Sequence, residues 1–388
     1  MTATEQEVDT TAEFGWTPEH RDLRDAVRRV LATRAPLSRA RELAESGTRH
    51  DPALWSVLAE QLGLQGLAIP TDLGGSGASR LELAIAMEEM GAVLLGGPFL
   101  STVVLAAEAL LASSDEAAQA EHLPRIAAGE LTATLAVVEA DGRWHEDGIA
   151  TVATGTGGDV RLTGTKEIVL DGADAELLIV AARGERGVSL YTVDAGATGL
   201  DRERLAVLDL TRPLARITLA DTPATLLGTD GAGWAVVEQV RRAATILVAA
   251  EQVGASTTVV AMTADYAKTR RQFGRPIGSF QGVKHRLADM AVRLEMSRSA
   301  AYWAAWQTPG SDDEALGAAV AGSYCSDSFL QSAKDMIQLH GGIGFTWEHD
   351  AHLFLRRARL DASVVGGSAE HRAALLPLIL PESTEASA

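Results

Sequence analysis

The sequence predicts an α+β protein in which a helical domain comes first, a β domain lies in the middle and a helical bundle comes last. The main observation is a change in the spacing of apolar residues, from a helical to a strand-like period near residue 132 and back near residue 231. The length agrees, because 388 residues correspond to two or three domains at roughly 150 residues each. The expected domains are 15–131, 132–230 and 231–380, between polar tails at 1–14 and 381–388 that are predicted to be disordered.

Helices are predicted in the first domain because apolar residues recur three and four positions apart, for example within 23–31 and 54–62. Ser79 is followed three residues later by Glu82, directly after a glycine-rich loop. This is the pattern of an N-terminal capping box. A helix should therefore begin directly after Ser79.

Short β-rich runs separated by Gly and Asp turns fill the middle domain, and they predict an antiparallel sandwich or barrel. The runs are 132–138, 149–153, 160–163, 167–170, 177–181, 188–193 and 215–219. The glycine-rich stretch 155–159 lies between two of these runs and opens no helix. We therefore interpret it as a hairpin turn and not as a phosphate-binding loop.

Long helical periods return in the last domain. The predicted helices are 234–270, 280–306, 312–340, 350–360 and 369–376. In the second, the apolar residues Val283, Leu287, Met290 and Leu294 step by four, three and four. Such a seam packs one helix on another, as in a helical bundle.

Composition argues against several classes of partner. The chain has 34 Lys and Arg against 52 Asp and Glu, a net charge of −18, so nucleic acid is not an expected partner. No apolar run reaches the ~18 residues that a spanning helix needs, so no membrane segment is expected. A single cysteine, Cys325, excludes an internal disulfide and is interpreted as a buried, unreactive thiol. With an acidic start to the chain, this favours the cytoplasm.

A compact cationic segment stands out in this acidic chain. Lys268, Arg270, Arg271 and Arg275 lie at the expected end of a long helix, where cations also complement the helix dipole. Taken alone, the segment fits a solvated helix end better than a ligand site.

The surrounding strings change that interpretation. Arg-Arg-Gln-Phe-Gly-Arg-Pro-Ile-Gly-Ser-Phe-Gln stands at 270–281, Gln-Leu-His-Gly-Gly-Ile-Gly-Phe at 338–345 and Leu-Phe-Leu-Arg-Arg-Ala-Arg at 353–359. With Leu-Gln-Gly-Leu-Ala-Ile-Pro-Thr-Asp-Leu-Gly-Gly at 64–75, they resemble the acyl-CoA dehydrogenase family over nearly the whole chain. The resemblance implies a central β domain between an N-terminal helical domain and a C-terminal four-helix bundle, usually in tetramers with FAD at subunit interfaces.

The resemblance also implies a reaction. Family members oxidise a saturated acyl-CoA thioester to the trans-2-enoyl-CoA: a carboxylate removes the α-proton, and the β-hydrogen leaves as hydride to the flavin. An electron-transfer flavoprotein later accepts the electrons.

The resemblance places FAD contacts in both strings of the last domain. Arg270 matches an arginine that meets the FAD pyrophosphate of a neighbouring subunit, for which a guanidinium is well suited. Phe273 and Gln281 match positions near the adenosine half. The positions that close over the FAD from the next subunit are Gln338, Gly341 and Gly342, whose glycines would let the backbone approach closely. A simple helix C-cap is the alternative explanation for the glycines.

The sequence departs from the family where a subunit holds its own flavin. The family segment Thr-Glu-Pro-x-x-Gly-Ser-Asp becomes Val-Glu-Ala-Asp-Gly-Arg-Trp-His at 138–145, and the family Trp-x-Thr beside the isoalloxazine becomes Ile-Val-Leu at 168–170. The flavin-stacking tryptophan and the threonine donor are both absent. Trp144 is interpreted as a surface or hairpin residue.

The base is missing as well. Gly366 stands where most members carry the catalytic glutamate, and Ala244 stands where a minority carry it, so no catalytic residue is assigned. Glu251 lies about two helical turns, some ten ångströms, beyond Ala244. Asp361 and Glu370 are candidates only by proximity in sequence.

Two histidines have a spacing that a metal could use on a helix, but no metal site is predicted. His349 and His352 are flanked by Glu348 and Asp350, at what the resemblance marks as the start of a helix. The acids are expected to cap that helix.

The pattern is asymmetric, because elements donated to a neighbour's FAD are kept and those that hold a chain's own flavin are lost. The leading hypothesis is a base-lacking subunit of a heterotetramer, as known among actinobacterial enzymes acting on bulky acyl-CoAs, with a second acyl-CoA dehydrogenase-like subunit as partner. An autonomous homo-oligomeric enzyme with a base such as Glu251 or Asp361, and a redox-inactive acyl-CoA binding or scaffolding protein, are the alternatives.

Overall fold

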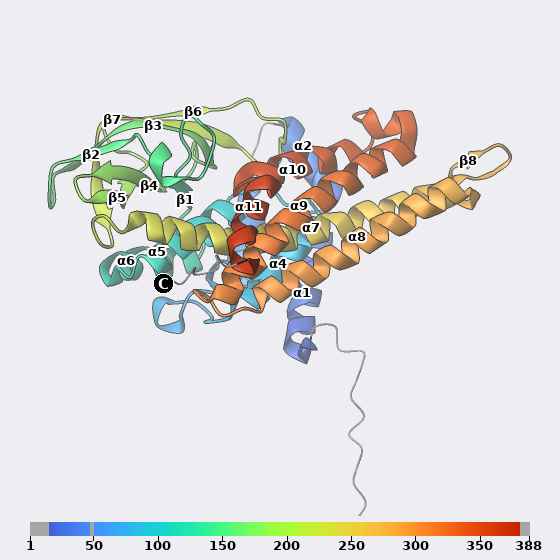
Figure 1. Cartoon of the computed structure of the whole chain (residues 1–388), viewed down its shortest axis with the longest axis horizontal. Coiled ribbons are helices and arrows are strands. Elements are labelled where there is room, and N and C mark those ends of the chain that lie inside the picture. Colours follow the sequence, from blue (N-terminus) through green and yellow to red (C-terminus); the bar gives the residue numbers. More distant parts are fainter. Residues whose placement is uncertain (1–14, 47–49, 381–388) are drawn as a thin grey trace, which may run out of the picture.

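A bundle of long helices runs along the molecule, with the β domain at one end of it and a small hairpin at the other (Figure 1). The computed structural model describes residues 15–46 and 50–380, so the predicted tails at 1–14 and 381–388 lie outside the described residues. The α+β class and the order helical, β, helical are confirmed.

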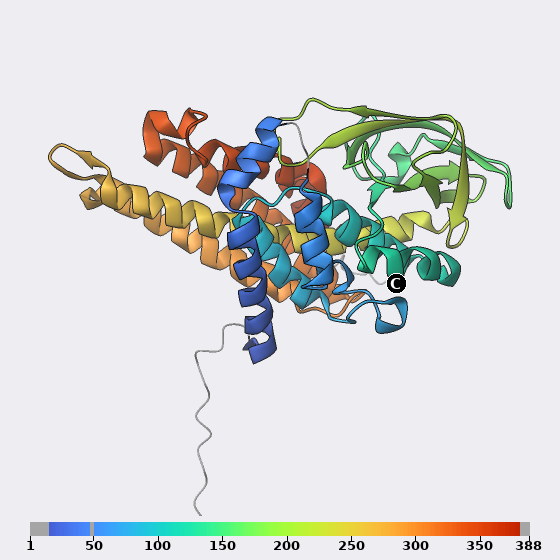
Figure 2. The ribbon, with the colours of Figure 1, turned by 180° about the vertical axis from the view of Figure 1, so that it is seen from behind.

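The N-terminal helices are α1 (Pro18–Arg34), α2 (Leu37–Ser46), α3 (Pro52–Glu60), α4 (Arg80–Ala92), α5 (Ala107–Ala112) and α6 (Glu116–Ala127), with short 3-10 helices η2 (Leu64–Gly66) and η3 (Thr71–Leu73) and a π-helix η4 (Leu100–Ala106). The first of them cross the middle of the bundle, as Figure 2 shows from behind, whereas α5 and α6 lie beside the β domain (Figure 1). The predicted cap of α4 is confirmed. The Ser79 hydroxyl accepts a hydrogen bond from the Leu81 amide, and the Ser79 amide donates to the Glu82 carboxylate at 2.9 Å.

Seven strands form the β domain. They are β1 (Ala133–Ala136), β2 (Val152–Thr154), β3 (Val160–Leu170), β4 (Leu177–Gly184), β5 (Gly187–Asp194), β6 (Leu200–Arg204) and β7 (Leu214–Leu227). The pairing order β4-β2-β3-β7-β5 closes on itself through β4–β5, so the strands form a barrel around a core of their own. The predicted turn at 155–159 joins the antiparallel pair β2 and β3.

Three details of the sheet differ from the prediction. β1 pairs with β4 in parallel, and β2 meets β4 in parallel at one position, so the barrel is mixed and not wholly antiparallel. The runs 160–163 and 167–170 are one strand, β3. Its pairing with β7 continues through the residues between the two runs, with shifts of register near Gly164 and Lys166. β6 was missed because its sequence, Leu-Asp-Arg-Glu-Arg, belongs to a largely exposed edge strand without an apolar face.

The C-terminal helices follow the predicted order. They are α7 (Gly233–Thr269), α8 (Gln281–Ala305), α9 (Asp312–His340), α10 (Ala351–Val364) and α11 (Ser368–Ile379). Met290 and Leu294 of the predicted seam are buried against neighbouring helices. Among the described helices, only α7 is long and apolar enough to cross a membrane, but 72% of its most apolar stretch is buried inside the molecule. It is the central helix of the bundle.

Candidate functional site

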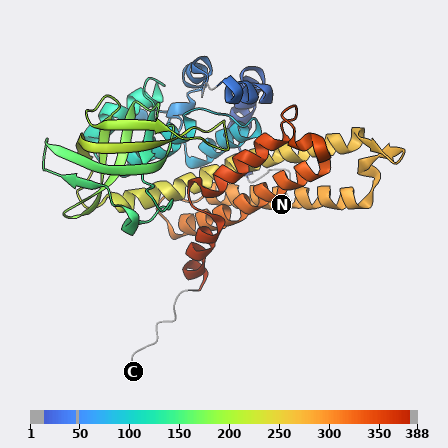
Figure 3. The same ribbon diagram turned by 90° about the horizontal axis from the view of Figure 1, so that it is seen from above.

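The cationic segment forms an exposed hairpin between α7 and α8. β8 (Arg271–Gln272) pairs with β9 (Arg275–Pro276), and a short turn, η6 (Ile277–Ser279), leads into α8. The hairpin turns at Phe273 and Gly274, which have φ of +51° and +76°. It lies at the far end of the bundle from the barrel (Figure 1, Figure 3).

The charge of this hairpin is not neutralised within the described residues. Lys268 pairs with Asp265 at 2.8 Å, but no acid pairs with Arg270, Arg271 or Arg275 in the part of the chain that the structure describes. Arg275 instead lies 4.0 Å from the ring centroid of Phe280. The hairpin therefore presents positive charge to solvent on a chain of net charge −18.

Other exposed side chains lie close to these cations in the sequence. Phe273 is 90% exposed, and Arg270 and Gln281 are exposed as well. An exposed aromatic ring beside guanidinium groups can stack on a base while the cations bind phosphate.

The second string lies at the same end of the bundle. Tyr266, in the last turn of α7, stacks on His340 with ring centroids 4.3 Å apart and donates a hydrogen bond to its carbonyl oxygen at 3.2 Å. His340 ends α9, Gln338 is exposed, and Gly341 follows with φ of +67°. A Cβ on Gly341 or Gly342 would meet nothing within 4 Å. Gly341 therefore does cap α9, and both glycines also leave the backbone open to a ligand.

Of the two histidines beyond this string, His349 caps the helix α10 (Ala351–Val364), whereas His352 lies within it. The His349 ring accepts a hydrogen bond from the Ala351 amide at 3.1 Å, while Asp350 forms an ion pair with Arg41. The expectation that the acids cap α10 was wrong, because the Asp350 side chain pairs with Arg41 of the N-terminal domain and makes no capping hydrogen bond. Among the described residues no group of His, Cys, Asp and Glu could hold a metal ion.

A cavity of about 180 Å³ lies between the barrel and α10. Its lining includes Leu105, Trp144, Ile168, Leu170 and Leu360, and every lining residue other than Trp144 and Ser363 is aliphatic or glycine. Trp144, interpreted from the sequence as a surface or hairpin residue, lies in the loop that joins β1 to β2. Its indole is half-buried and packs against the main core, because the loop 139–148 folds back over the barrel.

The loop that carries Trp144 is held by a buried ion pair. Glu139 binds Lys166 at 2.6 Å and also accepts hydrogen bonds from the amides of Ala150 and Thr151. Burial lowers the pKa of Lys166 to about 8, although Glu139 favours the charged form. Both groups are occupied by each other and offer nothing to a ligand.

This cavity does not fit an isoalloxazine. A three-ring flavin has a row of polar atoms along one edge, and the side chains at the corresponding place, Ile168 and Leu170, carry no donor. A volume of about 180 Å³ is also small for three fused rings. The hairpin end, with its unpaired arginines, does fit the pyrophosphate of FAD.

The two positions that the resemblance matches to a catalytic base, Ala244 and Gly366, have different surroundings. Ala244 is buried in the interior of α7. Gly366 has φ of +105°, and the carboxylate of Glu370, at the start of α11, lies beside it. Glu370 forms an ion pair with Arg143 of the 139–148 loop at 2.9 Å.

Glu251 and Asp361 belong to a buried ion-pair network and do not line the cavity. Glu251 pairs with both Arg357 and Arg212, and Arg212 also pairs with Asp361. Burial raises the pKa of Asp361 to about 7, against the attraction of Arg212. The network joins α7, α10 and the connection between β6 and β7, so its carboxylates have a structural role.

Comparison with known proteins decides the family. The N-terminal domain model of the acyl-CoA dehydrogenases matches residues 17–130, and the C-terminal domain model matches residues 231–376. Acyl-CoA dehydrogenase IpdE2 of Mycobacterium tuberculosis is 34% identical over 350 residues, which are 90% of this chain and 93% of that protein. The chain belongs to the acyl-CoA dehydrogenase family. Members of this family are FAD-dependent oxidoreductases of lipid β-oxidation, and the predicted resemblance is confirmed.

Solved acyl-CoA dehydrogenase complexes have the same fold. The ChsE4–ChsE5 complex from Mycobacterium tuberculosis superposes with a TM-score of 0.86 at 28% identity, over 95% of this chain and 99% of that chain. A variant of the Tcur3481–Tcur3483 steroid acyl-CoA dehydrogenase superposes with a TM-score of 0.82 at 31% identity, over 93% and 97%. This chain is therefore similar to subunits found in heteromeric members of the family.

Proposed function

We propose that this acyl-CoA dehydrogenase chain is the base-lacking subunit of a heteromeric complex that converts an acyl-CoA thioester to the 2-enoyl-CoA. A second acyl-CoA dehydrogenase-like subunit supplies the base and most of the FAD site. An electron-transfer flavoprotein accepts the electrons. The complex works in the cytoplasm, where the buried Cys325 thiol, whose pKa burial raises to about 12, stays reduced.

One observation carries this proposal: the cationic hairpin and the barrel lie at opposite ends of the molecule (Figure 1). A single FAD cannot contact both within one chain. The exposed hairpin is cationic, whereas the cavity beside the barrel is apolar, and Gly366 stands at the position that the resemblance matches to the usual base. The hairpin therefore serves a cofactor held by another subunit.

The residues of this chain have defined parts in such a shared site. Arg270 binds the FAD pyrophosphate, the Phe273 ring contacts the adenosine half, and Gln281 and Gln338 add polar contacts. The open backbone at Gly341 and Gly342 closes over the cofactor. When bound, the flavin accepts the hydride that leaves the substrate.

The test is to co-express the chain with its dehydrogenase-like partner and count FAD per assembled tetramer, for which we expect two. Replacing Arg270 by Met should leave assembly intact and lower the FAD retained after gel filtration. The matched control is Arg186→Met, an exposed arginine of the barrel 3.7 Å from Asp230. Four FAD per tetramer, full retention in Arg270→Met, or turnover by this chain alone would contradict the proposal.

Glu370 provides a specific argument for the autonomous enzyme, because its carboxylate lies beside the usual base position. Under that second candidate, Glu370→Gln abolishes turnover by the purified chain and by the complex. Under the leading proposal, the complex carrying Glu370→Gln turns over as the unmodified complex does. If the chain is instead a redox-inactive scaffold, mixing it with the partner subunit should leave the amount of bound FAD unchanged.

A further inference from the structure

Tyr266, in the last turn of α7, contacts both of the segments that the proposed function assigns to FAD. Its carbonyl oxygen accepts a hydrogen bond from the Arg270 amide at 2.8 Å, and this bond ends α7. Its hydroxyl donates to the His340 carbonyl at 3.2 Å, and its ring stacks on the His340 imidazole with centroids 4.3 Å apart. Tyr266 therefore joins the start of the cationic hairpin to the residue that precedes Gly341.

On the hairpin side, the backbone of Arg270 is fixed while its side chain is exposed. The Arg270 carbonyl accepts a hydrogen bond from the Ile277 amide at 2.8 Å, which closes the root of the hairpin. The Arg270 amide is bound to Tyr266, so both backbone polar groups of Arg270 are paired. The guanidinium therefore extends from a backbone whose position depends on Tyr266.

On the other side, His340 is the last residue of α9, where carbonyl groups have no partner within the helix. The Tyr266 hydroxyl supplies the missing donor. The His340 side chain is buried, and its Nδ1 donates to the Met336 carbonyl oxygen at 2.8 Å, because a carbonyl oxygen can only accept. His340 is therefore a fixed root for the open backbone at Gly341 and Gly342.

We propose that Tyr266 is a positioning residue for the shared FAD site, because it sets the distance between the Arg270 side chain and the backbone at Gly341 and Gly342. Its carbonyl holds one segment and its hydroxyl holds the other, so their separation is fixed before FAD arrives. Binding then does not have to order the two segments, which raises affinity. This role rests on the proposed function, since the two segments matter together only if they contact one FAD.

The experiment titrates FAD into the complex of this chain with its dehydrogenase-like partner, after the bound FAD has been removed, and follows flavin fluorescence. Tyr266→Phe keeps the ring and removes one hydrogen bond, so the dissociation constant for FAD should rise about five-fold. In a complex that already carries Arg270→Met, the same change should raise it less than about two-fold, because one of the two contacts to be aligned is gone. A general loss of stability would have the same effect in both backgrounds.

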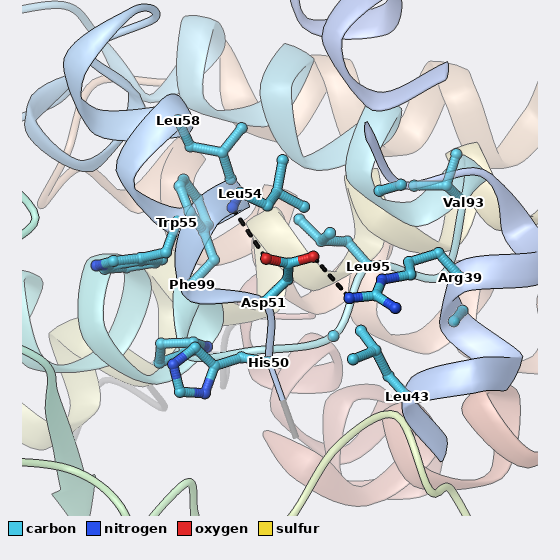
Figure 4. Close-up of a pocket in the computed structure, with 14 residues that line it drawn as sticks. Arg39, Leu43, His50, Asp51, Leu54, Trp55, Leu58, Val93, Leu95 and Phe99 are labelled. Atoms are coloured by element: carbon cyan, nitrogen blue, oxygen red, sulfur yellow. Dashed lines mark hydrogen bonds and ion pairs between the residues drawn. The ribbon is translucent and has the colours of Figure 1, made fainter. Parts of the chain in front are cut away.

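Trp55→Phe is the matched control, in the N-terminal pocket shown in Figure 4. The Trp55 indole donates to the Gly129 carbonyl at 2.9 Å. This variant therefore also removes one hydrogen bond from an aromatic side chain to a backbone carbonyl, but in a part of the chain that has no contact with either segment. It should leave the dissociation constant for FAD unchanged.

The results for Arg270→Met and Tyr266→Phe separate this role from the proposed function. If Arg270→Met alone does not weaken FAD binding, the proposed function is contradicted, and the role of Tyr266 falls with it. If Arg270→Met does weaken FAD binding, three results would each overturn the role of Tyr266 alone. They are an unchanged affinity in Tyr266→Phe, an equal effect of this change in both backgrounds, and an equal loss of affinity in Trp55→Phe.

Discussion

The carboxylate of Glu370 lies 2.9 Å from the point where a Cβ on Gly366 would stand. Gly366 is the position that the resemblance matches to the family's usual base. Its backbone, with φ of +105°, favours glycine, and the carboxylate of Glu370, which is bound to Arg143, lies where a side chain would begin. The surrounding structure therefore disfavours a glutamate at this position.

Restoring a glutamate at Gly366 should therefore destabilise the chain and not activate it. We expect Gly366→Glu to lower the free energy of unfolding by about 1–3 kcal/mol, because a side chain is strained at this φ and meets Glu370. Urea denaturation measures the change. Adding Glu370→Ala should recover only the part due to contact. Gly367→Ala, where a Cβ meets nothing closer than 3.7 Å, is the control, and equal stability of Gly366→Glu and this control would refute the expectation.

The crossing of α4 and α7 depends on two glycines. A Cβ on Gly254 would stand 1.7 Å from the Glu88 carbonyl oxygen, and one on Gly91 would stand 2.0 Å from the Glu251 carbonyl oxygen. Gly254→Ala must push the two backbones apart, so it should lower the free energy of unfolding by about 3 kcal/mol, the upper end of the overpacking range.

Gly282→Ala is the matched control for this crossing, because it adds the same methyl group to a helix where a Cβ meets nothing within 4 Å. It should be neutral or stabilise the chain by up to about 1 kcal/mol. Similar melting temperatures for the two variants would show that the helices can separate at no cost.

Arg357 should be the most sensitive charged residue of the interior. Its side chain is 0% exposed, and it binds Asp209 at 2.8 Å as well as Glu251. Arg357→Met leaves two buried carboxylates without this partner, so a loss of about 3–5 kcal/mol is expected. Arg356→Met removes the neighbouring arginine, which lies over the exposed Trp347 ring, and should cost under about 1 kcal/mol. Chemical denaturation of both variants compares them, and a small effect at Arg357 would contradict the importance of the network.

His371 should make stability depend on pH. Burial, aided by the charge of Arg241, lowers the pKa of His371 to about 4, whereas an unfolded histidine titrates near pH 6.5. Between these values the unfolded chain binds a proton that the folded chain does not. The contribution of His371 to stability is therefore complete above pH 6.5 and is lost as pH falls towards 4, by up to about 3 kcal/mol.

The difference in unfolding free energy between the unmodified chain and His371→Gln, measured at pH 7 and pH 5, isolates this effect. The variant should gain relative stability at pH 5. Asp361 changes the free energy of unfolding in the opposite direction, because burial raises its pKa to about 7. This contribution is present in the unmodified chain and in the variant, so it cancels in the difference between them. His285→Gln, at an exposed position of α8, is the control variant. A difference for His371→Gln that does not change between pH 7 and pH 5 would disprove the assignment.

Much of the fold was predictable because its signals are local. The cap at Ser79, the turn at 155–159 and the helices of the bundle each depend on residues within a few positions of one another. β6 was not predicted, because a mostly exposed strand of charged residues has no local apolar period.

The candidate site was predictable in composition and not in arrangement. The sequence by itself determined the family, the cationic string at 270–281 and the absence of glutamate at Gly366 and Ala244. Only the tertiary structure decided that Arg143 meets Glu370, 227 residues away, that Arg357 meets Glu251, 106 residues away, and that Trp144 lines a cavity. Caps and periods depend on neighbours along the chain, whereas these contacts depend on how elements that are distant in the chain pack together, which residue spacing does not encode.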